Sequence, residues 1–180
     1  MKMSAEQIIA AYSAGGTQRF HTRPTLKSQS VAAHAHGVAL LCCYLAGGAP
    51  SAALLMAALT HDHGEYWTGD VPAPVKHHSA EVEKIFEELE ATHLAKNTGI
   101  LPLELSDEES LALSLADKLE GLLYIRSEQR LGNKNLDQSA YRYGSYIWSI
   151  AQSRLNEPVV TRTLELLQKL EYLPRSILQP

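Results

Sequence analysis

The sequence has few cysteines and lacks any long apolar segment. Its two cysteines, Cys42 and Cys43, are neighbours in an apolar run that we expect to be helical, so their side chains point in different directions. This placement excludes both a disulfide framework and a CxxC site, and free thiols are typical of a reducing compartment. No apolar run approaches membrane-spanning length, and residues 1–16 lack the apolar centre of a signal peptide. We therefore expect a cytoplasmic protein without a membrane partner.

The sequence also lacks a block of lysine and arginine. With 16 basic and 20 acidic residues, its formal net charge is −4. A surface that binds long nucleic acid needs a concentration of positive charge, so we expect no nucleic-acid polymer as a partner. A mononucleotide needs only a few local cations and is not excluded. The length of 180 residues, 45% of them hydrophobic, suits one domain with a sizeable core, and we assign residues 1–180 to it.

Strand alternation, internal repeats and low-complexity segments are missing as well. Apolar residues instead recur at helical spacing between serine, glycine and proline residues that are typical of helix ends. Ser4 with Gln7, and Ser106 with Glu109, form capping-box patterns, and Pro50 stands where a helix would begin. We predict an all-α domain of about six or seven helices, at residues 4–14, 28–46, 50–61, 79–97, 106–129, 137–155 and 158–170. The expected inner face of the fourth helix consists of Val82, Ile85, Phe86, Leu89 and His93.

Ionisable side chains crowd the segment that follows the third predicted helix. Residues 61–76 read HDHGEYWTGDVPAPVK, and His61 and Asp62 stand where that helix is expected to end. Adjacent imidazole and carboxylate groups at such a point can turn toward one metal ion. Glu65 and Asp70 follow in a loop punctuated by glycine and proline. We interpret this segment as part of a functional site, with His63 exposed beside it.

Two further residues extend this dipeptide into a possible metal site. His34 lies on the apolar stripe of the second predicted helix, and Asp117 lies beside the apolar stripe of the fifth. Each has an ordinary explanation, because a single inward histidine is more often a hydrogen-bonded core residue and an aspartate beside a stripe usually faces water. Together with His61 and Asp62 they offer two nitrogen and two oxygen ligands. That combination leaves room for water and is typical of a catalytic metal site.

The order of these residues resembles a known family. The pattern H…HD…D, with 27 residues from His34 to His61 and 55 from Asp62 to Asp117, is similar to that of the HD-domain metal phosphohydrolases. More narrowly, the chain resembles the bacterial 5′-deoxynucleotidase branch and small phage enzymes of that branch that hydrolyse deoxyadenosine nucleotides. The features that carry this likeness are Arg19-Phe20, Val31-Ala-Ala-His34, His61-Asp62-x-x-Glu65-x-x-Thr68-Gly69-Asp70-x-Pro72-x-Pro74-x-Lys76 and Ala116-Asp117. Two departures are Ala33, where relatives often carry glutamate, and Phe20, where tryptophan is common.

The resemblance implies an HD-type domain and a chemistry based on one divalent transition metal ion, Co, Mn or Zn. The implied metal ligands are His34, His61, Asp62 and Asp117. Such an ion supplies hydroxide at neutral pH and polarises a phosphate oxygen. Glu65 is then expected to act as general acid or base. Asp70 is expected to orient the sugar and the attacked phosphate.

A further group of residues is expected to bind the substrate. Its members are Arg19, Phe20, Thr22, Pro72, Pro74 and Lys76. Arg19 and Lys76 are the natural phosphate ligands, although either one alone is as readily a solvated surface charge. Phe20 would hold the base, with Thr22 nearby and one of the two prolines opposite. The alternative is that Phe20 is an ordinary core residue.

The implied reaction is hydrolysis of the 5′-phosphoester of 2′-deoxynucleotides. We expect dATP, with dADP and dAMP, to give deoxyadenosine and (tri)phosphate, because a second cation at Arg23 near Arg19 suits a longer phosphate chain. A broad-specificity 5′-deoxynucleoside monophosphatase is the main alternative. A catalytically silent module that binds nucleotides is a third, although the intact ligands and Glu65 count against it. We also expect a homo-oligomer, with the tyrosine-rich helix at 137–155 at the interface, although core packing explains that helix equally well.

Overall fold

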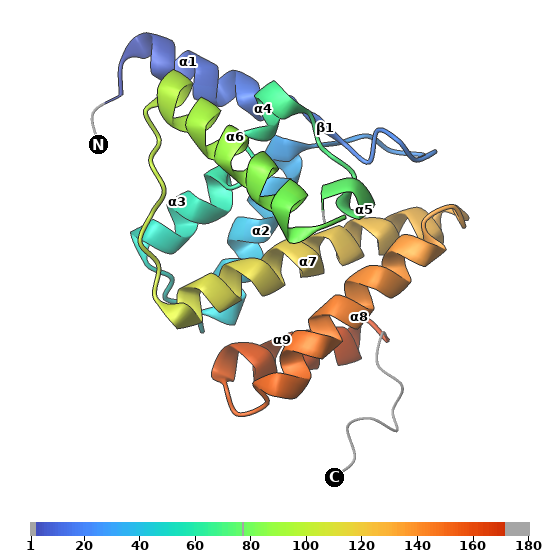
Figure 1. Ribbon diagram of the computed structural model, residues 1–180. Coiled ribbons are helices and arrows are strands. Elements are labelled where there is room, and N and C mark those ends of the chain that lie inside the picture. The colour runs from blue at the N-terminus through green and yellow to red at the C-terminus, as the bar shows by residue number, and fades with distance from the viewer. Residues whose placement is uncertain (1–2, 77, 172–180) are drawn as a thin grey trace.

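Helices dominate the computed structural model, which describes residues 3–76 and 78–171 (Figure 1). The elements are α1 (Ala5–Ala14), β1 (Gln18–Arg19), β2 (Gln29–Ser30), α2 (Val31–Leu45), α3 (Ala52–Thr60), α4 (Glu65–Thr68), α5 (Ala73–Lys76), α6 (Ala80–Thr98), α7 (Asp107–Arg130), α8 (Asp137–Ser153) and α9 (Pro158–Lys169). The predicted all-α class is confirmed, and the single turns α4 and α5 are additions that the sequence did not predict. None of the described helices combines the length and apolarity needed to span a membrane.

Serine side chains begin five of these helices. Ser4, Ser30, Ser51, Ser79 and Ser106 are the N-caps of α1, α2, α3, α6 and α7, and each accepts a hydrogen bond from the backbone N–H three residues on. The capping boxes predicted at Ser4 and Ser106 are confirmed. The prediction that Pro50 stands in the first turn of α3 is wrong. Pro50 precedes the N-cap Ser51, because the Ser51 hydroxyl accepts the backbone N–H of Leu54 and a proline side chain has no acceptor to do so.

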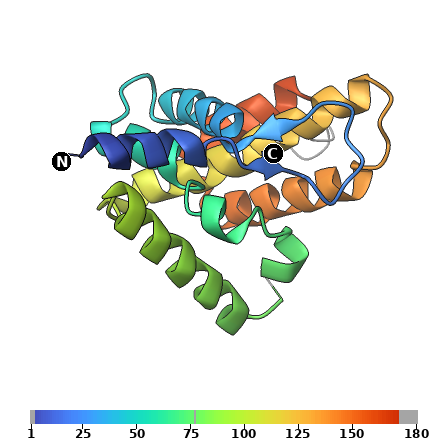
Figure 2. The ribbon, with the colours of Figure 1, turned by 90° about the horizontal axis from the view of Figure 1, so that it is seen from above.

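Helix α7 is the central element of the main bundle. It packs against α2, α3, α8 and α9, and α2 in turn packs against α3 and α9 (Figures 1 and 2). Leu115, Leu119, Leu122 and Ile125 of α7 are fully buried and share one hydrophobic core with Val38 of α2. Burial of an aliphatic side chain of this size stabilises a fold by about 1.5–3 kcal/mol. The pair of α2 and α7 is therefore a firm support for side chains that project from it.

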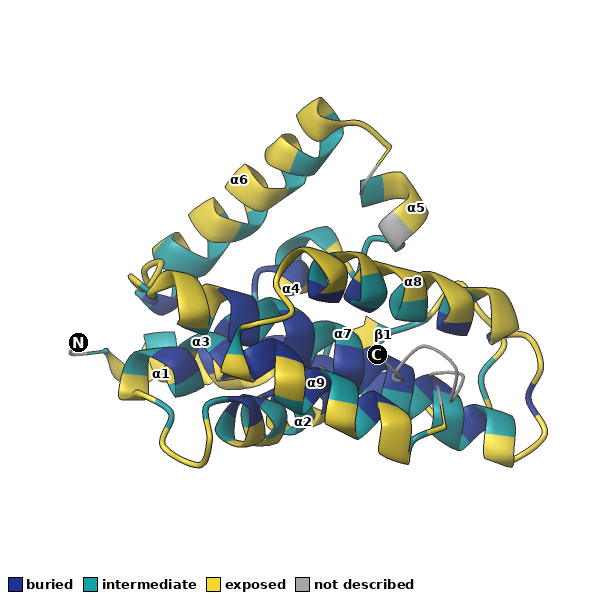
Figure 3. Cartoon of the chain, turned by 90° about the horizontal axis from the view of Figure 1, so that it is seen from below, coloured by how far each residue is buried: buried dark blue, intermediate teal, exposed yellow. Residues whose placement is uncertain are grey.

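Helix α6 lies apart from this bundle. It packs mainly against α1, α4 and α5, and most of its surface is exposed or half-buried (Figure 3). The inner face expected for it is wrong in part, since Ile85 is 49% and Leu89 is 43% exposed, while Val82, Phe86 and His93 are half-buried. The reason is that its partners α1, α4 and α5 are short and cover only part of a helix of this length.

A small antiparallel pair of strands corrects the expectation that no strand forms. Strand β1 pairs with β2 in the register Gln18 to Ser30 and Arg19 to Gln29. Each strand has two residues, which is too short to show the alternation of apolar and polar residues that identifies strands in a sequence. The pairing places Arg19 beside the beginning of α2. Residues 20–28 form the loop between the two strands.

Candidate metal-binding and catalytic site

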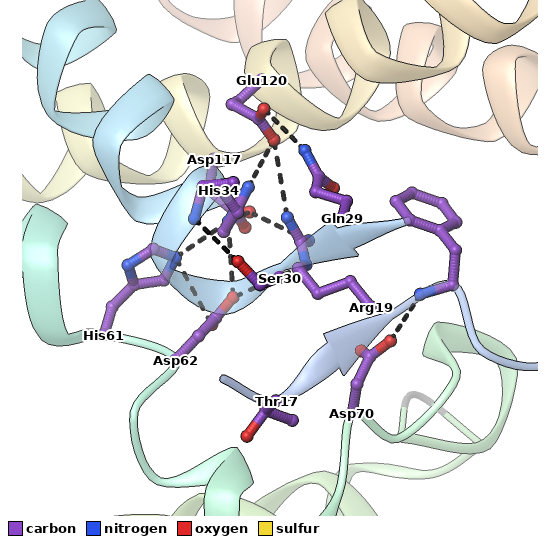
Figure 4. A network of polar contacts seen from close by, with 12 residues as sticks. Thr17, Arg19, Gln29, Ser30, His34, His61, Asp62, Asp70, Asp117 and Glu120 are labelled. Atoms are coloured by element: carbon purple, nitrogen blue, oxygen red, sulfur yellow. Dashed lines mark hydrogen bonds and ion pairs between the residues drawn. The ribbon is translucent and has the colours of Figure 1, made fainter. Parts of the chain in front are cut away.

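Side chains from three helices converge on one point of the bundle. His34 belongs to α2, His61 caps the C-terminus of α3 and Asp117 belongs to α7, and one ligand atom from each lies within 4.8 Å of the others. Asp62 joins them, because its Oδ2 is 3.3 Å from Nε2 of His34 and its Oδ1 is 3.3 Å from Nε2 of His61. The structure therefore brings together all four side chains that the sequence singled out (Figure 4).

The two histidine rings present their lone pairs to this point. Nδ1 of His34 bonds to the carboxylate of Glu120, and Nδ1 of His61 lies 3.0 Å from a backbone carbonyl of α3. Both acceptors require a proton on Nδ1, which leaves Nε2 of each neutral ring unprotonated. The two Nε2 atoms are 3.3 Å apart. Nε2 of His34 also lies 3.3 Å from an oxygen of Asp62 and 3.2 Å from an oxygen of Asp117. Lone pairs and negative oxygens this close repel one another without a cation, so the donor set fits a divalent metal ion.

The carboxylate of Asp117 is held ionised and in a fixed orientation. Although burial opposes its charge, the neighbouring imidazole of His34 and the ammonium group of Lys118 hold the pKa of Asp117 well below its ordinary value. Lys118 donates to Oδ2 of Asp117 at 2.6 Å, and Oδ1 is the oxygen that lies beside His34. One oxygen therefore faces the convergence point while the other is occupied by the lysine.

Glu120 is a site residue that the sequence reasoning missed. Besides bonding to His34, it accepts a hydrogen bond from the side-chain amide of Gln29 at 2.8 Å. Gly37 of α2 makes room for it, since a Cβ atom at that position would lie 2.6 Å from Cγ of Glu120. A signal was present in the sequence, because Glu120 follows Asp117 by three residues and so shares its helix face. The role of Gln29 had no such signal, because it depends on the strand pairing.

Arg19, expected to bind phosphate, lies inside this ring of carboxylates. Its guanidinium nitrogens are 4.0 Å from Asp62, 4.0 Å from Asp117 and 3.5 Å from Glu120, and its side chain is only 8% exposed. Its Nη1 atom is buried and has no hydrogen-bond partner among the described residues. The guanidinium therefore keeps an N–H donor that makes no hydrogen bond among the described residues, while its charge offsets the neighbouring carboxylates.

Glu65 and Asp70, the two expected catalytic residues, lie at opposite ends of the short α4 segment. Glu65 is 6% exposed, and burial, with added repulsion from Asp62 and Asp70, raises the pKa of its carboxyl group to about 9. Its Oε2 atom has no hydrogen-bond partner among the described residues. Asp70 instead accepts the backbone N–H of Phe20 at 2.9 Å. Glu65 is thus suited to carry a proton at neutral pH, and Asp70 to fix the backbone near β1.

Comparison with known protein families matches this chain to one of them. A family model described as 5′-deoxynucleotidase YfbR-like matches residues 16–158. The chain belongs to this family. The 5′-deoxynucleotidase VV1113 of Vibrio vulnificus is 29% identical to it over an alignment of 137 positions, which covers 64% of this chain and 71% of that protein. A 5′-deoxynucleotidase of Vibrio cholerae is 26% identical over an alignment of 146 positions, which covers 69% of this chain and 75% of that protein.

Solved structures share the fold of this YfbR-like chain. An HD-domain phosphohydrolase from Listeria innocua superposes with a TM-score of 0.70 at 20% identity, over 94% of this chain and 90% of its own. A second neighbour is the HD phosphohydrolase DatZ of cyanophage S-2L, solved with dA and one catalytic Zn²⁺ ion. It superposes with a TM-score of 0.62 at 20% identity, over 90% of this chain and 94% of its own. The predicted HD-type helical fold is confirmed by these neighbours.

The residues expected to bind the base differ in their exposure and in their contacts. Phe20 has a backbone φ of 55° and stacks its ring on Tyr124 of α7, with 5.0 Å between ring centroids. Thr22 and Pro74 are exposed, and Pro72 is half-buried. The ring partner Tyr124 was not predicted. Tyr124 stands seven residues after Asp117, a spacing that places both on one side of a helix, but no sequence pattern indicates that Tyr124 contacts Phe20.

Lys76, the other expected phosphate ligand, is engaged in an ion pair. Its ammonium group lies 2.8 and 3.1 Å from the two carboxylate oxygens of Glu90 in α6. The pair ties the end of α5 to the middle of α6. His63, which we expected to be exposed, is half-buried, because α4 and α6 close over the segment that follows α3. Burial and the neighbouring His61 lower the pKa of His63.

Proposed function

We propose that this chain is a metal-dependent phosphohydrolase that cleaves the 5′-phosphoester of 2′-deoxynucleotides. The observation that carries the proposal is the convergence of four donors on one point with a buried guanidinium beside them. The proposed ligands of one Co, Mn or Zn ion are His34, His61, Asp62 and Asp117. A divalent ion bound there activates water and polarises a phosphoryl oxygen.

The free donor of Arg19 gives this chain a means of orienting the phosphate. Its buried Nη1 makes no hydrogen bond among the described residues and only a 3.5 Å ion-pair contact with Glu120, so its N–H is available to donate to a phosphoryl oxygen. Three carboxylates surround the guanidinium and hold it in place. The positive charge of Arg19 also prevents a phosphate dianion from facing those carboxylates directly. Binding and orientation of the scissile group therefore fall to Arg19.

Glu65 is proposed as the general acid. Because its pKa is raised to about 9, its carboxyl group is protonated at neutral pH. It can donate that proton to the departing 5′-oxygen when a water oxygen bonds to phosphorus and the phosphorus–oxygen ester bond breaks. The proton that the water loses passes to solvent, from which Glu65 is reprotonated. Asp70 acts indirectly, by holding the backbone of Phe20.

The substrate side of the site is proposed to consist of the residues expected from the sequence. They are Arg19, Phe20, Thr22, Pro72, Pro74 and Lys76. The cations near the metal centre are largely committed, Lys76 to Glu90 and Lys118 to Asp117. This shortage of free positive charge favours a monophosphate, and the curated relatives are named 5′-deoxynucleotidases.

Hydrolysis of dATP to deoxyadenosine and triphosphate is a second candidate. It is supported by the fold neighbour DatZ, whose structure contains dA and a catalytic Zn²⁺ ion. It is also supported by Arg23 of the β1–β2 loop, a second arginine after Arg19 of β1, which is exposed and so placed to meet a longer phosphate chain. The two candidates differ in phosphate number and in base specificity.

Product analysis separates the candidates. The purified protein is incubated with Mn²⁺, Co²⁺ or Zn²⁺ and with dAMP, dGMP, dTMP, dATP, dGTP or ATP, beside an Asp62→Ala variant. Metal-dependent release of nucleosides from several deoxynucleoside monophosphates, with ATP spared, supports the first candidate. Deoxyadenosine and triphosphate from dATP alone support the second. If no substrate is consumed with any metal, the phosphohydrolase proposal fails and a silent nucleotide-binding module replaces it.

A further inference from the structure

The loop at residues 20–28 is anchored by a buried carboxylate. Glu128, near the end of α7, is 0% exposed, and its two oxygens accept the backbone N–H groups of Leu26 at 2.6 Å and Lys27 at 2.9 Å. The side-chain amide of Asn133 donates to the same carboxylate at 2.8 Å and to the carbonyl of Pro24 at 3.0 Å. A buried charge is costly unless several donors satisfy it, and here three donors do so. The backbone of this loop is therefore fixed to α7.

Tyr124 fastens the same loop at two more points. Its hydroxyl donates to the backbone carbonyl of Lys27, and its ring stacks on that of Phe20 with an interplanar angle of 26°. Phe20 has a left-handed backbone, which is unfavourable for an aromatic residue and persists only when its surroundings enforce it. Asp70 holds its N–H group and Tyr124 its ring. The segment that follows Arg19 is thus constrained from both sides.

One face of α7 links these anchors to the metal centre. Asp117, Glu120, Tyr124 and Glu128 follow one another at intervals of three, four and four residues, which places them on one side of the helix. The first two reach the convergence point and the last two reach the loop. A rise of 1.5 Å per residue separates the two ends of this face by roughly 16 Å. Because α7 is one continuous helix with one side packed in the core, that separation is fixed.

We propose that Glu128 and Tyr124 are positioning residues for substrate binding, which hold loop 20–28 so that Phe20 stands in register with the metal centre. This inference rests on the proposed function. Neither residue touches the reacting atoms. Their effect is on how tightly the nucleoside part of the substrate is bound, and the metal site keeps its own support from Glu120 and Lys118.

Limited trypsin digestion tests the anchoring without any substrate or metal. Lys27–Ser28 is an exposed bond in the loop, and its cleavage gives a fragment of residues 1–27 that mass spectrometry identifies. Glu128→Gln replaces an acceptor by a donor facing backbone N–H groups, so cleavage after Lys27 is expected to accelerate at least about tenfold. Tyr124→Phe keeps the stacked ring and removes one hydrogen bond, so cleavage after Lys27 is expected to accelerate roughly two- to tenfold. Glu108→Gln, an exposed change on the same helix, is the matched control.

Cleavage after Lys84 in α6 distinguishes a released loop from a loosened fold. General unfolding accelerates cleavage at both sites, whereas loss of the anchor accelerates it only after Lys27. If Tyr124→Phe and Glu128→Gln both leave the rate after Lys27 at the wild-type value, or raise both rates equally, the anchoring is wrong.

Steady-state kinetics test the positioning role. Both variants are expected to raise the KM for a deoxynucleotide several-fold, up to about tenfold, and to leave kcat within about twofold. The metal dissociation constant, measured by calorimetry, is expected to be unchanged. An unchanged KM despite a released loop overturns the proposal, and so does a matching loss of metal affinity. If wild-type protein proves inactive, the proposed function fails separately, and calorimetric dissociation constants for dAMP then give the same comparison between variants.

Discussion

His34 of α2 and Glu120 of α7 are joined through Nδ1 of the imidazole ring. This bond turns Nε2 of His34 toward His61 and Asp117, which lie 3.3 and 3.2 Å away. The other oxygen of Glu120 is held by the amide of Gln29 at 2.8 Å, so the ring is fixed from behind by a carboxylate that is itself fixed. The geometry of the convergence point is therefore built into the packing of α2 on α7.

Glu120→Gln is expected to weaken metal binding. A glutamine accepts less strongly from Nδ1 of His34, so the ring is less basic and less firmly oriented. Losses of such partners typically cost about 10- to 100-fold in metal affinity. Titration calorimetry with Mn²⁺ or Zn²⁺ measures the change, with Glu108→Gln as the exposed control on the same helix. Equal affinities in the wild-type and Glu120→Gln proteins would contradict the role given to this bond.

Two glycines inside helices are expected to respond oppositely to alanine. At Gly37 a new Cβ would lie 2.6 Å from Cγ of Glu120, so the carboxylate must move, at a cost of about 1–3 kcal/mol in stability. At Gly144 of α8 a new Cβ meets nothing within 4 Å, so higher helix propensity adds up to about 1 kcal/mol. Denaturant unfolding of Gly37→Ala and Gly144→Ala measures both. A stabilised Gly37→Ala protein would show that Glu120 does not need that space.

Divalent metal is expected to stabilise the protein against heat. At a concentration about 100 times its dissociation constant, a ligand of the folded state adds about 2.7 kcal/mol, which corresponds to a Tm increase of roughly 5–10 °C for a domain of this size. Asp117→Asn removes a charged donor and is expected to lose most of this increase. Asp107→Asn, in the exposed first turn of α7, is expected to keep it. Differential scanning calorimetry with Mn²⁺ and with EDTA gives the comparison, and a full metal response in Asp117→Asn would remove Asp117 from the ligand set.

Glu65 is expected to make the metal-free protein less stable at high pH. Its folded pKa of about 9 lies above its ordinary value of 4.5, so the folded state keeps a proton that the unfolded state has released. The stability that this bound proton gives the folded state is fully present below about pH 4.5 and is lost as pH rises toward 9. Glu65→Gln has no such proton to lose.

The Tm difference between Glu65→Gln and wild type is therefore expected to grow from pH 5 to pH 9 in EDTA, in favour of the variant. Glu87→Gln, an exposed change in α6, is expected to give a constant difference. A difference that stays flat for Glu65→Gln would mean that this carboxyl group titrates normally in the folded protein.

Much of the local structure was predictable because its signals are local. A serine hydroxyl reaches the N–H three residues on within one turn, so Ser4, Ser79 and Ser106 marked helix beginnings correctly. The face of α2 that carries His34 followed from helical spacing, and His34 is fully buried. The order of His34, His61, Asp62 and Asp117 pointed to one convergence point because each stood on or beside the inner side of its own helix.

The sequence by itself determined the longer helices, the HD-type fold and which four donors face inward. Only the tertiary structure decided their partners: Glu120 behind His34, Glu90 on Lys76, and Tyr124 and Glu128 on loop 20–28. Helical periodicity fixes which side of a helix a residue occupies. Which side chain it meets depends on how segments about 14 to 100 residues apart pack against one another, and that packing leaves no local pattern.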